Sequence, residues 1–281
     1  MRNRFPSIPC SRLFPAQIVA AAAWVAFALP RFLSAQEEAV GPPDHEREEL
    51  GVNRYTAPRI EQVFERLDKL KPLPFAQLWR DLPASSPAHR EQKGLIFGGL
   101  IADGFLVVAA QKPNLVEDLG RVLLREARGL GVGDRVMRHS ASLTGLGRSG
   151  NWTAVRNELI ETQADVEHAM INLRDEKMAA LISLGGWLRG LEIGAAAVEG
   201  QFTPERARVL DQPELVDYFA EELTTLPPAV AHTPVFEKLR SGVKEIQTIM
   251  GKAGKGGLQL PEVRAIHTQA QELDLTVRRN N

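Results

Sequence analysis

A small set of charged residues could carry chemistry in this chain, and the first is a single carboxylate inside a long apolar run. Asp103 is the only charged residue in the run 94–110, GLIFGGLIADGFLVVAA. An unpaired buried carboxylate is costly, so Asp103 should have a partner or a raised pKa. Arg189 and Glu192 form a narrow polar strip, three residues apart, in a second apolar run. With Asp103 they make a candidate buried polar site, favoured as a structural ion pair over a catalytic acid.

The second candidate is a histidine–carboxylate pattern on one predicted helix. Asp165 and His168 lie three residues apart, and Glu161 lies one turn earlier. This spacing is that of half of a bundle metal site, in which two Glu-x-x-His motifs and two further carboxylates converge. His139, on the preceding predicted helix, could approach His168 across a helical hairpin. Because the sequence holds no second copy of the motif, solvated surface groups are favoured over a metal site and no cofactor is expected.

The third candidate is a basic helix face that could bind an anion or an acidic partner. Arg121, Arg125 and Arg128 share this face. The next long helical pattern is acidic, so ion pairing within the molecule is the favoured interpretation. Nucleic acid is not expected as a partner, because the chain carries 35 acidic against 34 basic side chains and its N-terminus indicates export.

Motifs of the common catalytic classes are absent. The sequence contains no G-x-S-x-G and no H-E-x-x-H, and its glycine–lysine pairs at 251–257 lack the spacing of a phosphate-binding loop. The only cysteine, Cys10, lies in the N-terminal segment. A mature chain without that segment would have no thiolate nucleophile, no disulfide and no cysteine-bound metal.

The elements that must position these residues are two apolar helices, at 94–110 and 181–198. Each carries small residues at four-residue intervals: Gly94, Gly98 and Ala102 in the first, and Gly186, Gly190 and Gly194 in the second. Interior glycines cost about 1 kcal/mol each relative to alanine, and they persist where another backbone comes close. We therefore expect the two stripes to face each other.

The rest of the chain also favours helices. Aromatic residues make up only 6% of the chain, apolar residues recur at helical spacing, and no strand-like alternation is present. We predict an all-α fold, a multi-helix bundle of antiparallel α-hairpins around a buried central helix at 94–110. The longest helical pattern runs from Trp152 towards Val198, and Gly185-Gly186 is the expected place for a kink or a break.

The N-terminal segment, residues 1–35, has the pattern of a secretory signal peptide. It has arginines at its start, no acidic residue before Glu37, and an apolar run at 18–29. An uncleaved anchor is the alternative, although a spanning helix needs about 20 apolar residues. The remaining predicted parts are a flexible linker at 36–56, a helical domain at 57–250, and a glycine-rich loop, C-terminal helix and polar tail at 251–281.

Together these observations predict an exported protein, periplasmic or extracellular, that acts in non-enzymatic binding or scaffolding. Its partner, a protein or a small molecule, is not identified by any motif. The alternatives are an enzyme or metal-dependent protein with a buried Asp/Arg/Glu or Asp/His site, and a self-associating structural protein. Contact with a membrane is expected only through an uncleaved N-terminal segment.

Overall fold

The computed structural model describes residues 59–253 and 256–279, and within these ranges the secondary structure is helical with no strand. The predictions for the signal peptide at 1–35 and the linker at 36–56 fall outside the described residues. The helices are α2 (Ile60–Asp68), α3 (Phe75–Leu78), α4 (Arg90–Ala109), α5 (Pro113–Gly129), α6 (Gly133–Ser149), α7 (Trp152–Asn172), α8 (Glu176–Gly200), α9 (Pro204–Ala207), the 3₁₀ turn η1 (Arg208–Leu210), α10 (Pro213–Thr224), α11 (Pro228–Ala231), α12 (Pro234–Ala253) and α13 (Leu260–Arg278). The prediction of an all-α, multi-helix fold is confirmed.

Helix α4 is the central element, and it is buried around its whole circumference. Every residue from Gly94 to Val108 is buried. The helix packs against α8, α5 and α7. The expectation of a buried central helix is therefore confirmed, and any polar group on α4 must find its partners inside the protein.

Helices α4 and α8 are both long and apolar enough to cross a membrane by length and composition alone. Within the described residues, however, α8 is buried along its apolar stretch and α4 nearly so. The neighbouring α5 is amphipathic and buries Val116, Leu119 and Leu123 beneath a charged outer face. The two apolar helices thus form the core, which is the environment that their composition requires.

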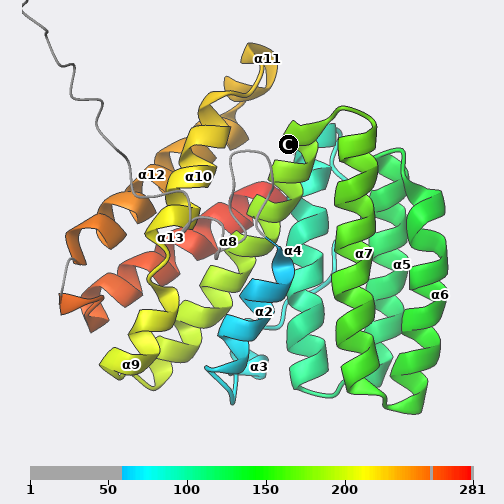
Figure 1. Cartoon of the computed structure of the whole chain (residues 1–281), viewed down its shortest axis with the longest axis horizontal. Helices are drawn as coiled ribbons and strands as arrows, with labels where there is room; N and C mark the ends of the chain where they lie inside the picture. Colours follow the sequence, from blue (N-terminus) through cyan, green and yellow to red (C-terminus); the bar gives the residue numbers. More distant parts are fainter. Residues whose placement is uncertain (1–58, 254–255, 280–281) are drawn as a thin grey trace, which may run out of the picture. The chain divides into compact units, whose positions relative to one another are not determined.

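The two apolar helices cross where their glycines let the backbones meet. A Cβ atom on Gly98 would lie 1.8 Å from the carbonyl oxygen of Ile182, and one on Gly185 would lie 2.0 Å from that of Leu95. Figure 1 shows α8 running obliquely past α4 at this point. No side chain fits between the helices there, so glycine is required by the close approach.

The two glycine stripes were expected to face each other along their length, but they do so only near the crossing. A Cβ atom on Gly190 would meet Val63 of α2 at 2.3 Å, and one on Gly194 would meet Leu210 of η1 at 2.9 Å. Helices packed at an angle diverge away from their crossing point. The glycines beyond the crossing therefore accommodate other neighbours of α8.

The long helical pattern from Trp152 to Val198 is divided between Asn172 and Glu176, and not at the predicted Gly185-Gly186. Helix α7 ends at Asn172 and α8 begins at Glu176, with Arg174 at a positive φ of 58° between them. The Asp175 side chain caps α8 by accepting a hydrogen bond from the backbone N–H of Met178 at 3.3 Å. The Gly185-Gly186 pair lies inside a continuous helix, so the expected break there is wrong.

Two groups of helices surround the crossing. Helices α5, α6 and α7 lie side by side, and α7 contacts both α4 and α8 (Figure 1). On α8, the other main neighbour is α13, which also packs against α12 and α4. Sequence analysis set 251–281 apart from the helical domain, whereas α13 buries Ile266, Ala270 and Leu273 against its neighbours.

Candidate functional site

The structure brings together the three residues of the candidate buried polar site. Asp103 projects from α4, and Arg189 and Glu192 project from α8. Arg189 Nε donates a hydrogen bond to Asp103 Oδ1 at 2.7 Å, and its Nη1 lies 2.8 Å from Glu192 Oε2. Arg189 Nη2 donates to the carbonyl oxygen of Leu78 at 2.5 Å. The guanidinium group thus links the two apolar helices to the last residue of α3.

Two further residues, Arg80 and Asp274, complete this group, and sequence analysis did not identify them. Arg80 Nε donates to Asp103 Oδ2 at 3.0 Å, and its Nη1 forms an ion pair with Asp274 of α13. Asp274 lies four residues after the buried Ala270, so an acid on the apolar face of α13 was the available signal. We call Arg80, Asp103, Arg189, Glu192 and Asp274 the Arg189 network.

Electrostatics in the Arg189 network favour the charged forms. Burial by itself would raise the pKa of Asp103, but the charges and hydrogen bonds of Arg189 and Arg80 lower it below its ordinary value. Burial opposes the charge on Arg189, yet Asp103 and Glu192 raise its pKa. Burial lowers the pKa of Arg80 to about 10, which leaves it cationic at neutral pH. The expected alternative of a raised pKa for Asp103 is wrong, because the carboxylate has two cationic partners.

The centre of the Arg189 network is closed to solvent, whereas the side chains of Arg80 and Asp274 are 17% and 10% exposed. Asp103 and Arg189 are each 1% exposed and Glu192 is 5% exposed. A general acid or base must come within hydrogen-bond reach of a substrate. Burial and mutual pairing therefore make these three residues structural partners of the α4–α8 crossing.

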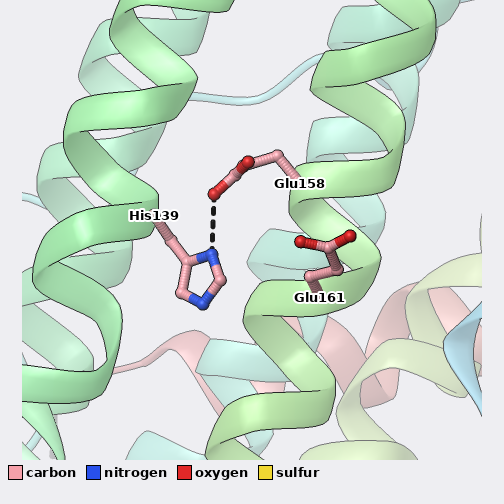
Figure 2. Close-up of side chains that lie close together, drawn as sticks. All are labelled: His139, Glu158 and Glu161. Atoms are coloured by element: carbon pink, nitrogen blue, oxygen red, sulfur yellow. Dashed lines mark hydrogen bonds and ion pairs between the residues drawn. The ribbon is translucent and has the colours of Figure 1, made fainter.

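A second group lies between α6 and α7 and contains the predicted residues His139 and Asp165. His139 Nδ1 lies 2.7 Å from Glu158 Oε1, and His139 Nε2 lies 3.0 Å from Asp165 Oδ2. Figure 2 shows the His139 ring reaching from α6 towards Glu158 and Glu161 on α7. We call His139, Glu158, Glu161 and Asp165 the His139 cluster.

The positions in the His139 cluster follow from helical periodicity. Glu158, Glu161 and Asp165 are separated by steps of three and four residues, so they share one face of α7. His139 lies beside the middle of this face. His168, the next residue at that spacing, is exposed and lies outside the group whose ligand atoms come together. The expected approach of His139 to His168 is therefore replaced by contacts to carboxylates up to three turns earlier on α7.

Two of the three arginines on the predicted basic face of α5 form ion pairs or hydrogen bonds within the protein. Arg121 pairs with Asp118 on the same helix. Arg125 bonds to Glu126 and donates to the carbonyl oxygens of Pro83 at 2.8 Å and Ala84 at 3.1 Å. Arg128 is exposed. Intramolecular pairing was the favoured interpretation, but these partners lie on α5 and in the segment before α4 rather than on the acidic α7.

An apolar pocket of about 190 Å³ lies where the start of α4 meets α11 and α12. Its lining is largely apolar and includes two prolines, two alanines, two valines and a phenylalanine: Pro87, Ala88, His89, Glu91, Gln92, Ala229, Val230, Thr233, Pro234, Val235 and Phe236. The sequence contains no signal for this pocket, because its two walls lie more than a hundred residues apart in the chain.

A third titratable group lies where α7 packs on α8. Glu167 Oε1 accepts hydrogen bonds from Gln163 Nε2 at 2.8 Å and Ser183 Oγ at 2.7 Å. Burial raises the pKa of Glu167 to about 7, although these two hydrogen bonds favour the carboxylate. This side chain therefore changes charge near neutral pH within the folded protein.

The comparisons with known proteins assign no role to these sites. The chain matches no family model, no curated protein and no solved structure. Any function for this protein must therefore be argued from its own residues.

Proposed function

We propose that this protein is a non-enzymatic binding protein and that its ligand occupies the pocket between residues 87–92 and 229–236. The observation that carries the proposal is the pocket itself, about 190 Å³ of mostly apolar lining with a few polar groups at its edge. This composition is typical of sites that bind small molecules. The bound group would be a small apolar body.

The polar groups of the pocket indicate the chemistry of the ligand. Gln92 Nε2 already donates to the carbonyl oxygen of Val277 at 2.5 Å, and Thr233 Oγ1 donates to that of Val230 at 2.8 Å. Glu91 is the carboxylate among the lining residues, and it is half-buried. A carboxylate beside an apolar cavity favours a cation, so we propose a ligand with an apolar body and one amino group.

The low exposure of the Arg189 network supports a non-enzymatic function. Its central carboxylate and guanidinium are each 1% exposed, and each has partners within the protein. A structural role for this network directs the search for a ligand site to the apolar pocket between residues 87–92 and 229–236.

The test is the binding of dansylcadaverine, an apolar fluorophore with a primary amine, followed by its fluorescence. We expect saturable binding, competition by hexylamine, and weaker competition by hexanoic acid. Ala229→Trp, an exposed position at the pocket, should block binding, and Glu91→Gln should weaken it about tenfold. The matched control is Glu61→Gln, an exposed carboxylate on α2. Equal binding by wild type and Ala229→Trp would contradict the proposal.

We also propose that the protein works outside the cytoplasm, as its N-terminal residues predict. The support is the sequence of residues 1–35, with its basic start and apolar run. N-terminal sequencing of the protein recovered from outside the cytoplasm should begin at Gln36. Recovery of the uncut chain from the cytoplasm alone would contradict this part.

A further inference from the structure

The His139 cluster places four groups that can bind a metal on two helices held side by side. His139 is 8% exposed, so its ring is fixed by packing between α6 and α7. Figure 2 shows Glu158 and Glu161 leaving the same face of α7, and Asp165 lies four residues further along the helix. One ligand atom each from His139, Glu158 and Glu161 lie within 4.8 Å of one another.

We propose that the His139 cluster binds one divalent transition-metal ion, with Zn²⁺ as the favoured ion. His139 Nδ1, Glu158 and Glu161 are the ligands, and water completes the coordination. Zinc lies about 2.0–2.2 Å from nitrogen and oxygen ligands, so two ligands of one ion are at most about 4 Å apart. The three atoms already lie within 4.8 Å of one another, close to this spacing.

The choice of ion follows from the donor set. An imidazole nitrogen suits zinc, copper, iron and nickel, whereas calcium and magnesium prefer sites made of oxygen atoms alone. Zinc sites with three protein ligands from histidine and carboxylate side chains keep a position open for water. Glu161 is exposed, so the site opens to solvent on that side and an ion can enter.

The groups behind the ligands are already in the arrangement that supports a bound metal. The second ring nitrogen of His139, Nε2, faces Asp165 Oδ2 at 3.0 Å. Ser142 Oγ donates to Glu158 Oε2 at 2.8 Å and so orients that carboxylate. Metal-binding histidines usually donate their free N–H to a carboxylate, and metal-binding carboxylates are themselves hydrogen-bonded.

The charge of the His139 cluster also favours a cation. Both ring nitrogens of His139 face carboxylate oxygens, at 2.7 and 3.0 Å. A neutral imidazole has one N–H, so it can donate to only one of them. A second ring proton would satisfy both carboxylates, and a metal ion at Nδ1 does the same, because it attracts Glu158 while Nε2–H donates to Asp165. With a neutral imidazole, the three carboxylates of the cluster carry three negative charges, so one divalent ion neutralises two of them.

The test is titration of the chelator-treated, full-length protein with ZnCl₂ by isothermal titration calorimetry, and with CoCl₂ by visible absorption. We expect one ion per chain and a Co²⁺ spectrum of low coordination number. Glu161→Gln changes an exposed side chain, so the protein should fold normally and lose about tenfold or more in Zn²⁺ affinity. His139→Gln should abolish specific binding.

Asp165→Asn separates a ligand from a supporting group. Supporting carboxylates typically contribute 10–100-fold in metal affinity. We expect a loss of about that size with a Co²⁺ spectrum of unchanged shape, because the ligands stay the same. His168→Gln, an exposed histidine on α7, and Glu245→Gln, an exposed carboxylate on α12, are the matched controls and should bind as wild type does.

Two results would overturn the proposal. One is wild-type affinity for Zn²⁺ no higher than that of Glu161→Gln, with circular dichroism showing both proteins folded. The other is a loss of binding in the His168→Gln control as large as in His139→Gln. The ligand pocket takes no part in this experiment, so either result leaves the proposed function standing.

Discussion

The Arg189 network and the His139 cluster are built alike and differ in what surrounds them. In each group one basic side chain lies between two carboxylates. Arg189 lies between Asp103 and Glu192, and His139 lies between Glu158 and Asp165. The central side chains are both buried, but the Asp103 side chain of the Arg189 network is 2% exposed, whereas the Asp165 side chain of the His139 cluster is 42% exposed. One arrangement is closed and the other is open on one side.

The chemistry of the central side chain matches this difference. A guanidinium group keeps its proton and has no lone pair to offer a metal, so it can only hold carboxylates in place. An imidazole can lose a proton and coordinate a metal. The Arg189 network joins α4 and α8 and reaches α13 through Arg80, whereas the His139 cluster joins α6 and α7 only. We therefore expect the Arg189 network to determine the stability of the fold and the His139 cluster to determine metal binding.

The largest effect should come from removing the central cation of the closed network. Arg189→Met leaves Glu192 without its cation and leaves Asp103 with Arg80 alone. Breaking a buried ion pair costs about 3–5 kcal/mol, and we expect a loss of that size in the free energy of unfolding, measured in urea. The matched control, Arg264→Met, removes an exposed partner of Glu199 and should cost less than about 1 kcal/mol. Equal losses of unfolding free energy in the two variants would show that the buried Arg189 pairs contribute no more than the exposed Arg264–Glu199 pair.

The next effect concerns the backbone crossing that closes the Arg189 network. Gly98→Ala places a Cβ atom against the carbonyl oxygen of Ile182, so the helices must separate, at a cost of about 3 kcal/mol. Gly145→Ala on α6 is the control, because nothing lies within 4 Å of the added atom. Alanine there should stabilise the protein by up to about 1 kcal/mol. Similar melting temperatures for the two variants would contradict the close crossing.

A smaller effect on stability is expected from the titration of Glu167, which lies where α7 packs on α8. Its pKa is raised from 4.5 to about 7 by burial, so the folded protein keeps a proton that the unfolded chain releases. The stabilisation from this proton is complete below pH 4.5 and is lost as pH rises through 7. Glu167→Gln should remove this slope and be more stable than wild type at pH 8, where the folded wild-type protein must bury the carboxylate. The same slope in both proteins would show that Glu167 is ionised throughout.

Asp103 gives the opposite slope in the closed network. Its pKa is lowered by its cationic partners against the effect of burial, so its contribution to stability is complete above its unfolded value of 3.8. That contribution is lost as pH falls through the lower folded value. Urea unfolding between pH 2 and 4 should show this loss in wild type and a smaller one in Asp103→Asn.

The smallest effect on stability should come from the open cluster without metal. Glu161→Gln replaces an exposed side chain, and surface substitutions usually change stability by less than about 0.5 kcal/mol. Saturating Zn²⁺ should stabilise wild type, by about 2.7 kcal/mol at a hundredfold excess over the dissociation constant, and stabilise the variant less. A large loss in the metal-free variant would mean that this cluster supports the fold as the Arg189 network does.

Sequence and structure agree most closely where burial controls the pattern. The run at 94–110 has no polar face, so a central core helix followed from its composition, and Asp103 had to find a partner there. Charges are scarce in the two apolar runs, so the sequence offers Arg189 as one candidate partner, and the structure pairs the two residues. Helix boundaries follow less directly from burial, because the break at Leu173–Asp175 depends on a positive φ at Arg174 and on the Asp175 cap, both of which are local backbone effects.

By itself, the sequence determined the all-α fold, the two apolar helices and the need to neutralise Asp103, because each depends on which side chains are buried away from water. Only the tertiary structure decided that Arg80 and Asp274 join the Arg189 network, that His139 meets Glu158 and Asp165 instead of His168, and where the pocket lies. Those contacts depend on the angle and the level at which helices pack. Packing is set by the fit of whole surfaces, which no single stretch of sequence contains.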